Sequence, residues 1–124
     1  MTEIGDLLER SEEKLSTAKL LLREEKYSDS VSRAYYSMFH AAKALLLTKE
    51  SSPRTHAGVA SELGELFRDE IGAEMTSKFA TVQELREDAD YGSETDIDEK
   101  RTEEVIEIAE KFYSKAETII KEEQ

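Results

Sequence analysis

Apolar side chains recur at spacings of three and four residues along almost the whole chain, with charged side chains between them. This spacing is the period of an α-helix with one buried face. The pattern divides into five segments and predicts helices at about residues 2–25, 28–48, 54–69, 73–90 and 98–122. No segment shows the strict alternation of a half-buried strand.

Polar residues at the starts of these segments predict where the helices begin. Thr2 and Asp98 precede the first and last helices and are typical N-cap residues. The second helix can open at Ser28 or at Asp29. Each of these side chains can accept a hydrogen bond from a free backbone N–H in the first helical turn.

Breaks between the segments are marked by proline and glycine. Residues 49–53 form the clearest break and contain Pro53, the only proline. Gly72 marks the next turn, and Gly92, in the loop at 91–98, suits a helix C-terminal cap. These short loops join the predicted helices into a single domain over residues 1–124, an all-α, five-helix, antiparallel up-and-down bundle.

The second helix has a wider apolar arc than the others. Its apolar positions are Val31, Ala34, Tyr35, Met38, Phe39, Ala42, Leu45 and Leu46, extended by Tyr36 and Ala41. We therefore expect this helix to be buried on more than one side. A bundle of this size has limited capacity to cover such an arc, which favours a homodimer.

Composition limits the class of protein. Hydrophobic residues make up 38% and charged residues 37% of the 124 positions, which suits a folded helical domain rather than a disordered tail. The chain has no cysteine, so disulfides and thiolate zinc sites are excluded. No apolar run approaches the ~18 residues of a membrane span. We expect a soluble, cytoplasmic protein without membrane attachment.

The net charge of −12 argues against general binding to DNA, because phosphate neutralisation needs a basic surface. The charge is unevenly distributed. Residues 84–124 hold 15 acids and 6 bases, whereas residues 26–61 hold five bases and two acids, a local +3. Both histidines, His40 and His56, lie in this basic segment, which is therefore one place to look for an anionic ligand.

Most familiar catalytic motifs are absent from the sequence. A di-iron bundle requires Glu three residues before His, but Ser37 and Pro53 stand there before His40 and His56. The five glycines are scattered singly, so there is no phosphate-binding glycine loop, and no Gly-x-Ser-x-Gly motif occurs. The sequence predicts neither a metal site nor a cofactor.

Residues 32–46 carry the most distinctive chemistry. Arg33 and His40 lie two helical turns apart on one face, with Tyr36 between them. A cation, a phenol and an imidazole on one face are typical of a surface for a nucleotide or a protein partner. The alternative interpretation is that Arg33 pairs with an acid while His40 and the aromatic rings serve the core.

Three stretches resemble the HEPN superfamily, the higher eukaryote and prokaryote nucleotide-binding domains, and in particular its small stand-alone prokaryotic members. They are SRAYYSMFHAAKALL at 32–46, THAGV at 55–59 and LREDADYG at 85–92. The resemblance implies a helical bundle, usually homodimeric. It also implies a minimal nucleotidyltransferase as the partner protein, often in a toxin–antitoxin pair.

Active members of this family are metal-independent ribonucleases, in which an Arg and a His separated by four to six residues, near the fourth helix, meet their twins across the dimer cleft. The resemblance assigns Arg86 as this arginine, and on a helix Arg86 and Asp90 share a face. Tyr91 stands where the histidine is expected, and a phenol of pKa ~10 is a poor general base at neutral pH. Arg33 and His40 have the family spacing but lie in the second helix.

The sequence leaves three hypotheses open. The first is a homodimeric HEPN-type module that binds a nucleotide or RNA and has weak or no catalysis of its own. Its candidate ligand-binding residues are Arg86, Asp90, Tyr91, Arg33, Tyr36 and His40. The second is an endoribonuclease toxin that uses Arg86 with Tyr91 or His40. The third is a helical interaction protein without nucleotide chemistry.

Overall fold

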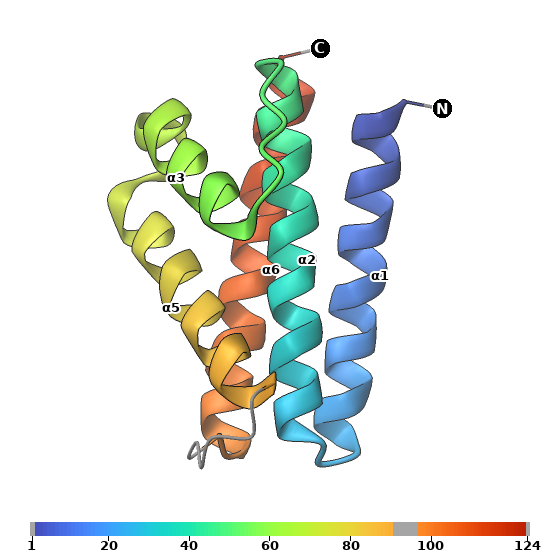
Figure 1. Cartoon of the computed structure of the whole chain (residues 1–124). Coiled ribbons are helices and arrows are strands. Elements are labelled where there is room, and N and C mark those ends of the chain that lie inside the picture. Colours follow the sequence, from blue (N-terminus) through green and yellow to red (C-terminus); the bar gives the residue numbers. More distant parts are fainter. Residues whose placement is uncertain (1, 91–96, 124) are drawn as a thin grey trace.

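The computed structural model describes residues 2–90 and 97–123, and these residues form six helices (Figure 1). The helices are α1 (Glu3–Arg23), α2 (Tyr27–Thr48), α3 (His56–Leu66), α4 (Arg68–Ile71), α5 (Ala73–Asp90) and α6 (Glu99–Glu122). The prediction of an all-α bundle is confirmed. None of the helices within the described ranges is long and apolar enough to cross a membrane.

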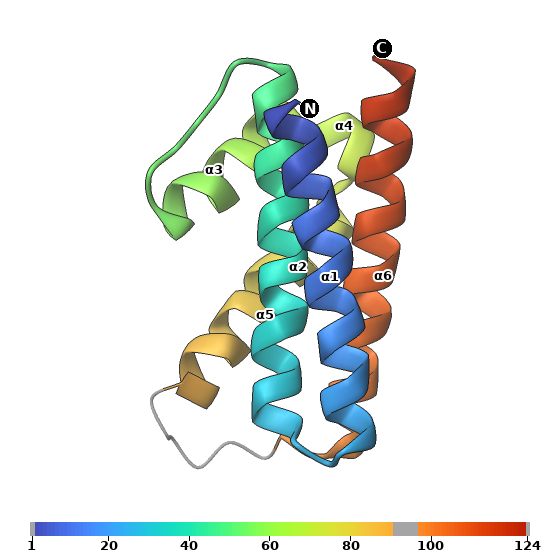
Figure 2. The ribbon, with the colours of Figure 1, turned by 90° about the vertical axis from the view of Figure 1, so that its right-hand side faces the viewer.

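The long helices α1, α2 and α6 lie side by side, while α3 and α5 cover another side of α2 (Figures 1 and 2). α1 and α2 are antiparallel, as are α5 and α6 (Figure 1). α6 runs in the same direction as α2, because the segment 49–55 returns along the bundle before α3 begins (Figure 2). α2 is thus the central helix, with α1 on one flank and α3 and α5 on another.

Two of the predicted helix starts are confirmed and one is wrong. The Thr2 hydroxyl accepts a 3.0 Å hydrogen bond from Gly5 N, and the Asp98 carboxylate accepts one of 2.8 Å from Arg101 N. α2 begins at Tyr27, earlier than either predicted start, and Lys26 before it makes no side-chain cap. The predicted cap at Gly92 lies outside the described residues.

The helix predicted over 54–69 is divided at Phe67, and this is the main correction to the sequence prediction. Phe67 has a φ of −123°, outside the helical range, and its side chain is fully buried. The Lys49 ammonium donates a 2.7 Å hydrogen bond to the Leu66 carbonyl at the end of α3 and lies 4.2 Å from the Phe67 ring centroid. Burial of Phe67 and this distant lysine together compensate the broken helical hydrogen bonding.

Small side chains let α1 and α2 approach closely. The Ser11 hydroxyl donates a 2.6 Å hydrogen bond to the Ser37 carbonyl, and the Ser30 hydroxyl donates one of 2.7 Å to the Ala18 carbonyl. All four residues are fully buried. The hydroxyls therefore cross-link the two helices, and both are themselves satisfied by hydrogen bonds.

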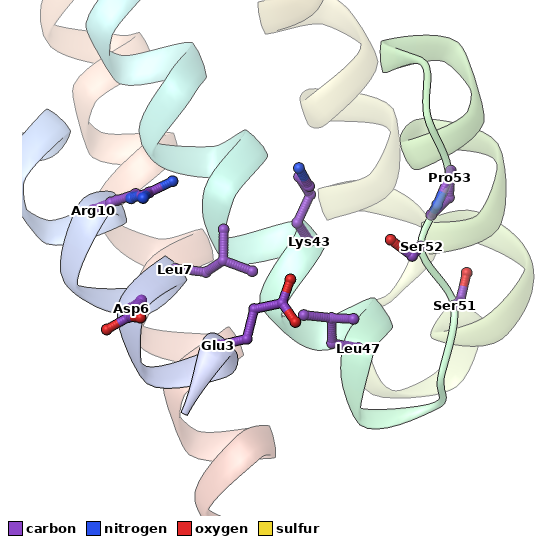
Figure 3. Close-up of a pocket in the computed structure, with 9 residues that line it drawn as sticks. All are labelled: Glu3, Asp6, Leu7, Arg10, Lys43, Leu47, Ser51, Ser52 and Pro53. Atoms are coloured by element: carbon purple, nitrogen blue, oxygen red, sulfur yellow. The ribbon is translucent and has the colours of Figure 1, made fainter. Parts of the chain in front are cut away.

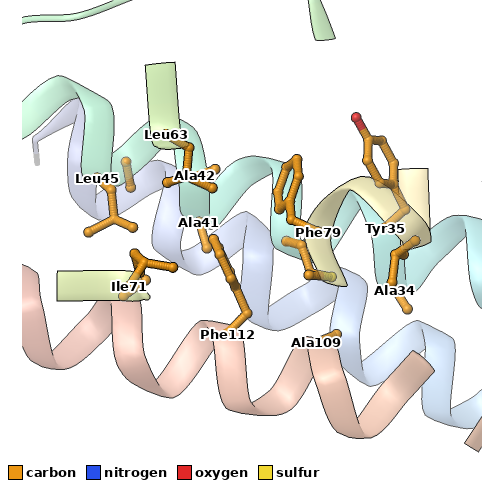
Figure 4. Packing of buried hydrophobic residues seen from close by; sticks show 14 of the residues in the cluster. Ala34, Tyr35, Ala41, Ala42, Leu45, Leu63, Ile71, Phe79, Ala109 and Phe112 are labelled. Atoms are coloured by element: carbon orange, nitrogen blue, oxygen red, sulfur yellow. The ribbon is translucent and has the colours of Figure 1, made fainter. Parts of the chain in front are cut away.

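Half of the 22 residues of α2 are buried, as the wide apolar arc predicts. Its side chains meet those of α3, α4, α5 and α6 in one core, in which the ring centroids of Phe79 and Phe112 lie 5.5 Å apart (Figure 4). Leu20, 49% exposed, is the only large hydrophobic residue exposed in the described part of the chain. One chain thus covers its own apolar arc, so this arc does not by itself require a second copy.

Candidate functional site

Arg86 lies one turn before the end of α5, where tyrosines of α2 surround its side chain. Its Nη1 donates a 2.8 Å hydrogen bond to the Asp90 carboxylate and a 3.3 Å bond to the Tyr36 hydroxyl. The guanidinium carbon lies 5.2 Å and 5.6 Å from the ring centroids of Tyr35 and Tyr36, within the range of cation–π attraction. The Arg86 side chain is only 16% exposed, which limits the positions it can adopt.

Arg86 retains hydrogen-bonding capacity. Its Nε is buried and has no hydrogen-bond partner among the described residues. A guanidinium carries five N–H donors, and the hydrogen bonds to Asp90 and Tyr36 both use Nη1. Asp90 and the tyrosines thus hold the arginine in place, and its hydrogen bonds to them use only one of its three nitrogens.

Tyr35 and Tyr36 are consecutive in α2, so their side chains leave the helix about 100° apart. Their rings meet edge to face, with centroids 5.2 Å apart. Tyr35 is fully buried, and its hydroxyl points away from the core (Figure 4). Burial raises the pKa of Tyr35 strongly, against the opposing effect of Arg86, so its hydroxyl keeps its proton at neutral pH.

His56 is the residue that sequence reasoning missed. It is the first residue of α3, and the Thr55 hydroxyl before it caps the helix by accepting a 2.9 Å hydrogen bond from Gly58 N. Its Nδ1 lies 2.6 Å from the Tyr35 hydroxyl, and its ring stacks on Phe39 with centroids 4.2 Å apart. These contacts with Tyr35 and Phe39 therefore fix the position and orientation of the imidazole.

Electrostatics favour a neutral imidazole at His56. Burial lowers the pKa of His56, Arg86 and Lys43 lower it further, and Glu87 opposes them. When Nδ1–H donates to the Tyr35 oxygen, Nε2 carries the free lone pair that a general base requires. We call Tyr35, Tyr36, His56, Arg86 and Asp90 the Arg86 cluster.

The Arg86 cluster offers a fixed guanidinium, phenolic hydroxyls and a neutral imidazole in one place. A guanidinium binds phosphate oxygens well because its donors are planar and its charge is permanent. An imidazole can move a proton near pH 7. Within residues 2–90 and 97–123, no group of three or more His, Asp or Glu side chains is arranged to hold a metal ion. The side chains of the cluster are of the kinds that can bind a phosphate and transfer a proton.

The structure brings together some of the residues that the sequence singled out. Arg86 contacts Asp90, four residues later on the same helix, and Tyr36 of α2. His40 neighbours Tyr36, with ring centroids 6.4 Å apart, but lines a separate hollow with residues of α1. Arg33 is exposed, and no contact within the described ranges joins it to Arg86. Tyr91 lies outside the described residues.

Another hollow lies between α1, the C-terminal half of α2 and the segment 49–55 (Figure 3). Its volume is about 210 Å³, and Leu7 and Leu47 are among the residues that line it. Arg10 and Lys43 bring two cations to it, while Glu3 and Asp6 bring two carboxylates. Its charges are balanced, which makes it a weaker candidate for an anion than the Arg86 cluster.

Two signals in the sequence point to His56. It is one of only two histidines, and it follows a threonine that can cap a helix. Neither signal predicts which helix His56 contacts. The path of the segment 49–55 decides that α3 begins beside Tyr35. A spacing rule that searches only after Arg86 cannot find a histidine placed 30 residues before it.

The HEPN domain family matches residues 4–119, nearly the whole chain. The chain therefore belongs to the HEPN domain family, and the resemblance seen in the sequence is confirmed. The fold class is confirmed as well: a crystal structure of TT1696 from Thermus thermophilus matches with a TM-score of 0.83 over 95% of this chain and 98% of that one. The two sequences are 18% identical, so this similarity shows the fold alone.

Relatives with higher identity are small prokaryotic proteins. A protein of Methanocaldococcus jannaschii named "Putative toxin" is 42% identical over 122 residues, which cover 97% of this chain and 90% of that protein. A Thermotoga maritima member of the UPF0332 family is 32% identical over 115 residues, 91% of this chain and 87% of the relative. The chain is thus similar over nearly its full length to a protein named as a toxin.

Proposed function

We propose that this chain is the HEPN component of a two-protein, toxin–antitoxin-type system and binds a nucleotide or RNA phosphate at the Arg86 cluster. The observation that carries the proposal is the environment of Arg86. Its guanidinium is held by Asp90 and two tyrosine rings, yet its Nε has no hydrogen-bond partner among the described residues. A preorganised cation with spare donors favours a phosphate ligand, and the name of the Methanocaldococcus relative supports the toxin context.

The test compares two arginines that each pair with an acid on their own helix. Arg86 pairs with Asp90, and Arg101 of α6 pairs with Glu104 at 3.1 Å. We expect Arg86→Ala to weaken binding of single-stranded RNA about 10- to 100-fold, since hydrogen bonds to charged groups contribute ~1.5–3 kcal/mol. Arg101→Ala should leave the affinity unchanged, and thermal melts monitor folding of both variants.

Failure of the unaltered chain to bind either RNA or nucleotides in this assay would contradict the proposal. The chain would then be better described as a helical interaction protein without nucleotide chemistry. Equal losses in Arg86→Ala and Arg101→Ala would also contradict it, because a general charge effect does not distinguish the two arginines.

A second candidate function, metal-independent endoribonuclease activity, is favoured by one observation. The neutral imidazole of His56 contacts the same tyrosine rings as Arg86, with Tyr35 and Tyr36 ring centroids 5.7 Å and 6.0 Å away. In this mechanism His56 takes the proton of an RNA 2′-hydroxyl while Arg86 holds the attacked phosphate. RNA cleavage in EDTA that is lost in both Arg86→Ala and His56→Gln, but kept in His40→Gln, would establish this function.

The proposal includes two protein partners: a second copy of this chain and a minimal nucleotidyltransferase. Membership of the HEPN family supports both, through the partner arrangement that the family resemblance implies. Co-expression with a nucleotidyltransferase encoded beside this gene, followed by purification through a tag on one chain, tests the second partner. Recovery of the tagged chain alone would count against the two-protein system.

A further inference from the structure

On the other side of Tyr36 from Arg86, helices α1 and α2 form a second basic surface. Arg10, Glu13, Lys14 and His40 line a hollow of about 340 Å³, which we call the His40 hollow. Arg10 also lines the hollow of Figure 3 together with Lys43, so the two hollows adjoin.

Three cations act on the single imidazole of this hollow. Burial lowers the pKa of His40, and Arg10, Lys14 and Lys43 lower it further, which places all three near the ring. None of the three forms an ion pair with a described residue, although seven other Lys and Arg side chains do. Two of these cations, Arg10 and Lys14, line the hollow with one carboxylate, Glu13, which gives it a local net charge of +1 in a chain of net charge −12. The local excess of positive charge favours an anionic ligand.

The His40 ring, which lines the hollow, carries an unsatisfied polar atom. His40 is only partly exposed, and its Nδ1 is buried without a hydrogen-bond partner among the described residues. A buried polar atom without a partner costs free energy that a bound ligand or an ordered water can recover.

Tyr36 connects the His40 hollow to the Arg86 cluster. Its hydroxyl accepts the hydrogen bond from Arg86, and its ring neighbours that of His40, one helical turn further along α2. Lys43, at the next turn, lies 5.6 Å from the Phe39 ring, which stacks on His56. A partly exposed aromatic ring thus lies between Arg86 and the histidine of the basic hollow. Proteins hold single-stranded nucleic acid by this combination of charge for phosphates and a ring face for a base.

We propose that an RNA strand crosses α2 with one phosphate at Arg86, a base on Tyr36 and a further phosphate in the His40 hollow between Arg10 and Lys14. This inference rests on the proposed function and extends it from one phosphate to a strand of several nucleotides. A mononucleotide or a dinucleotide, by contrast, contacts the Arg86 cluster but does not extend into the His40 hollow.

The test uses two matched pairs of cations, each pair four residues apart on one helix. Arg10 and Lys14 are replaced in Arg10→Gln/Lys14→Gln, and Lys111 and Lys115 of α6 are replaced in Lys111→Gln/Lys115→Gln as the control with the same change of charge. Fluorescence anisotropy measures binding of a labelled oligouridylate of about 12 nucleotides, within the range of single-strand site sizes. NMR titration measures binding of the dinucleotide UpU.

We expect Arg10→Gln/Lys14→Gln to lower affinity for the long strand at least about 10-fold at low salt. The slope of log K against log salt should fall by about 0.7, since the one phosphate contact that is lost contributes about 0.7 on a single strand. UpU should bind this variant as it binds the unaltered chain. The α6 control should keep both the affinity and the slope.

Unchanged binding of the long strand in Arg10→Gln/Lys14→Gln, or an equal loss in the α6 control, would overturn this inference. If Arg86→Ala still abolished binding in that case, the proposed function would stand without the extended path. If the unaltered chain bound neither the oligouridylate nor UpU, the proposed function would be overturned, and this inference with it.

Discussion

Arg86 shows how a few side chains can turn one arginine into a positioned cation. Two tyrosine rings restrict the guanidinium, and Asp90 one turn away fixes its orientation. On an exposed helix, an i,i+4 pair of this kind contributes only a few tenths of a kcal/mol. Here the pair is partly buried against aromatic rings, so its main effect is to reduce the entropy lost when a ligand binds.

The first prediction concerns the charge felt by His56. Arg86 lowers the pKa of His56 and Glu87 raises it, in addition to the lowering by burial. Arg86→Gln should therefore raise the His56 pKa, and Glu87→Gln should lower it further. A ¹H–¹⁵N NMR titration of the imidazole measures both shifts. The His40 pKa depends on Arg10, Lys14 and Lys43 instead, and it should stay unchanged in either variant.

The lowered pKa of His56 also determines how the free energy of unfolding depends on pH. The folded-state pKa of His56 is below the ordinary value of 6.5, so the unfolded chain binds more protons as pH falls through this range. The contribution of His56 to the free energy of unfolding is therefore complete above pH 6.5 and is lost as pH decreases below it. Urea unfolding should show a smaller loss in Arg86→Gln. A larger loss in that variant would contradict the assigned effect of Arg86.

At the scale of elements, local signals predicted helices better than they predicted the site. Thr2 and Asp98 cap α1 and α6 as expected, because an N-cap depends on a few neighbouring residues. The break at Phe67 was missed because it depends on burial of that ring and on Lys49, 18 positions earlier. Tertiary contacts of this kind leave no periodic signal in the sequence.

For the candidate site too, local contacts could be predicted from the sequence and tertiary contacts could not. Arg86 and Asp90 were predicted to share a face because four residues of helix separate them. The contact of Arg86 with Tyr36, 50 residues away, and the place of His56 beside Tyr35 depend on how α3 and α5 pack on α2. Spacing along one helix could not give that packing.

The second prediction tests whether the cap of α3 positions His56. Thr55→Ala removes the acceptor for Gly58 N, and Thr2→Ala removes the equivalent acceptor for Gly5 N in α1. Each should lower the free energy of unfolding by about 1 kcal/mol, as measured by urea unfolding. Only Thr55→Ala should also change the His56 imidazole resonances and weaken RNA binding. Equal effects of the two variants on binding would show that the cap acts through stability alone.

For the whole molecule, charge separates two kinds of surface. Residues 84–124, which include α6, carry a net −9, whereas Arg10, Lys14 and Lys43, which pair with no acid in the described ranges, gather on α1 and α2. An RNA strand is attracted to these cations and to Arg86, although Arg86 lies within the acidic segment. Added salt should therefore weaken RNA binding, because it competes for the phosphate contacts.

The last prediction is that salt has the opposite effect on association of two copies. Since one chain buries its own apolar core and Leu20 is the only large hydrophobic exposed in its described part, a homodimer must use a largely polar interface. A two-fold dimer brings together two copies that each carry a net charge of −12, so their net charges repel. Screening weakens this repulsion, with a Debye length of about 10 Å at 0.1 M salt.

Sedimentation velocity across a range of protein concentrations should show the monomer–dimer midpoint moving to lower concentration as NaCl rises from about 50 to 500 mM. A midpoint that moves to higher concentration would mean that opposite charges meet in the interface, and a monomer at every salt concentration would rule out the homodimer.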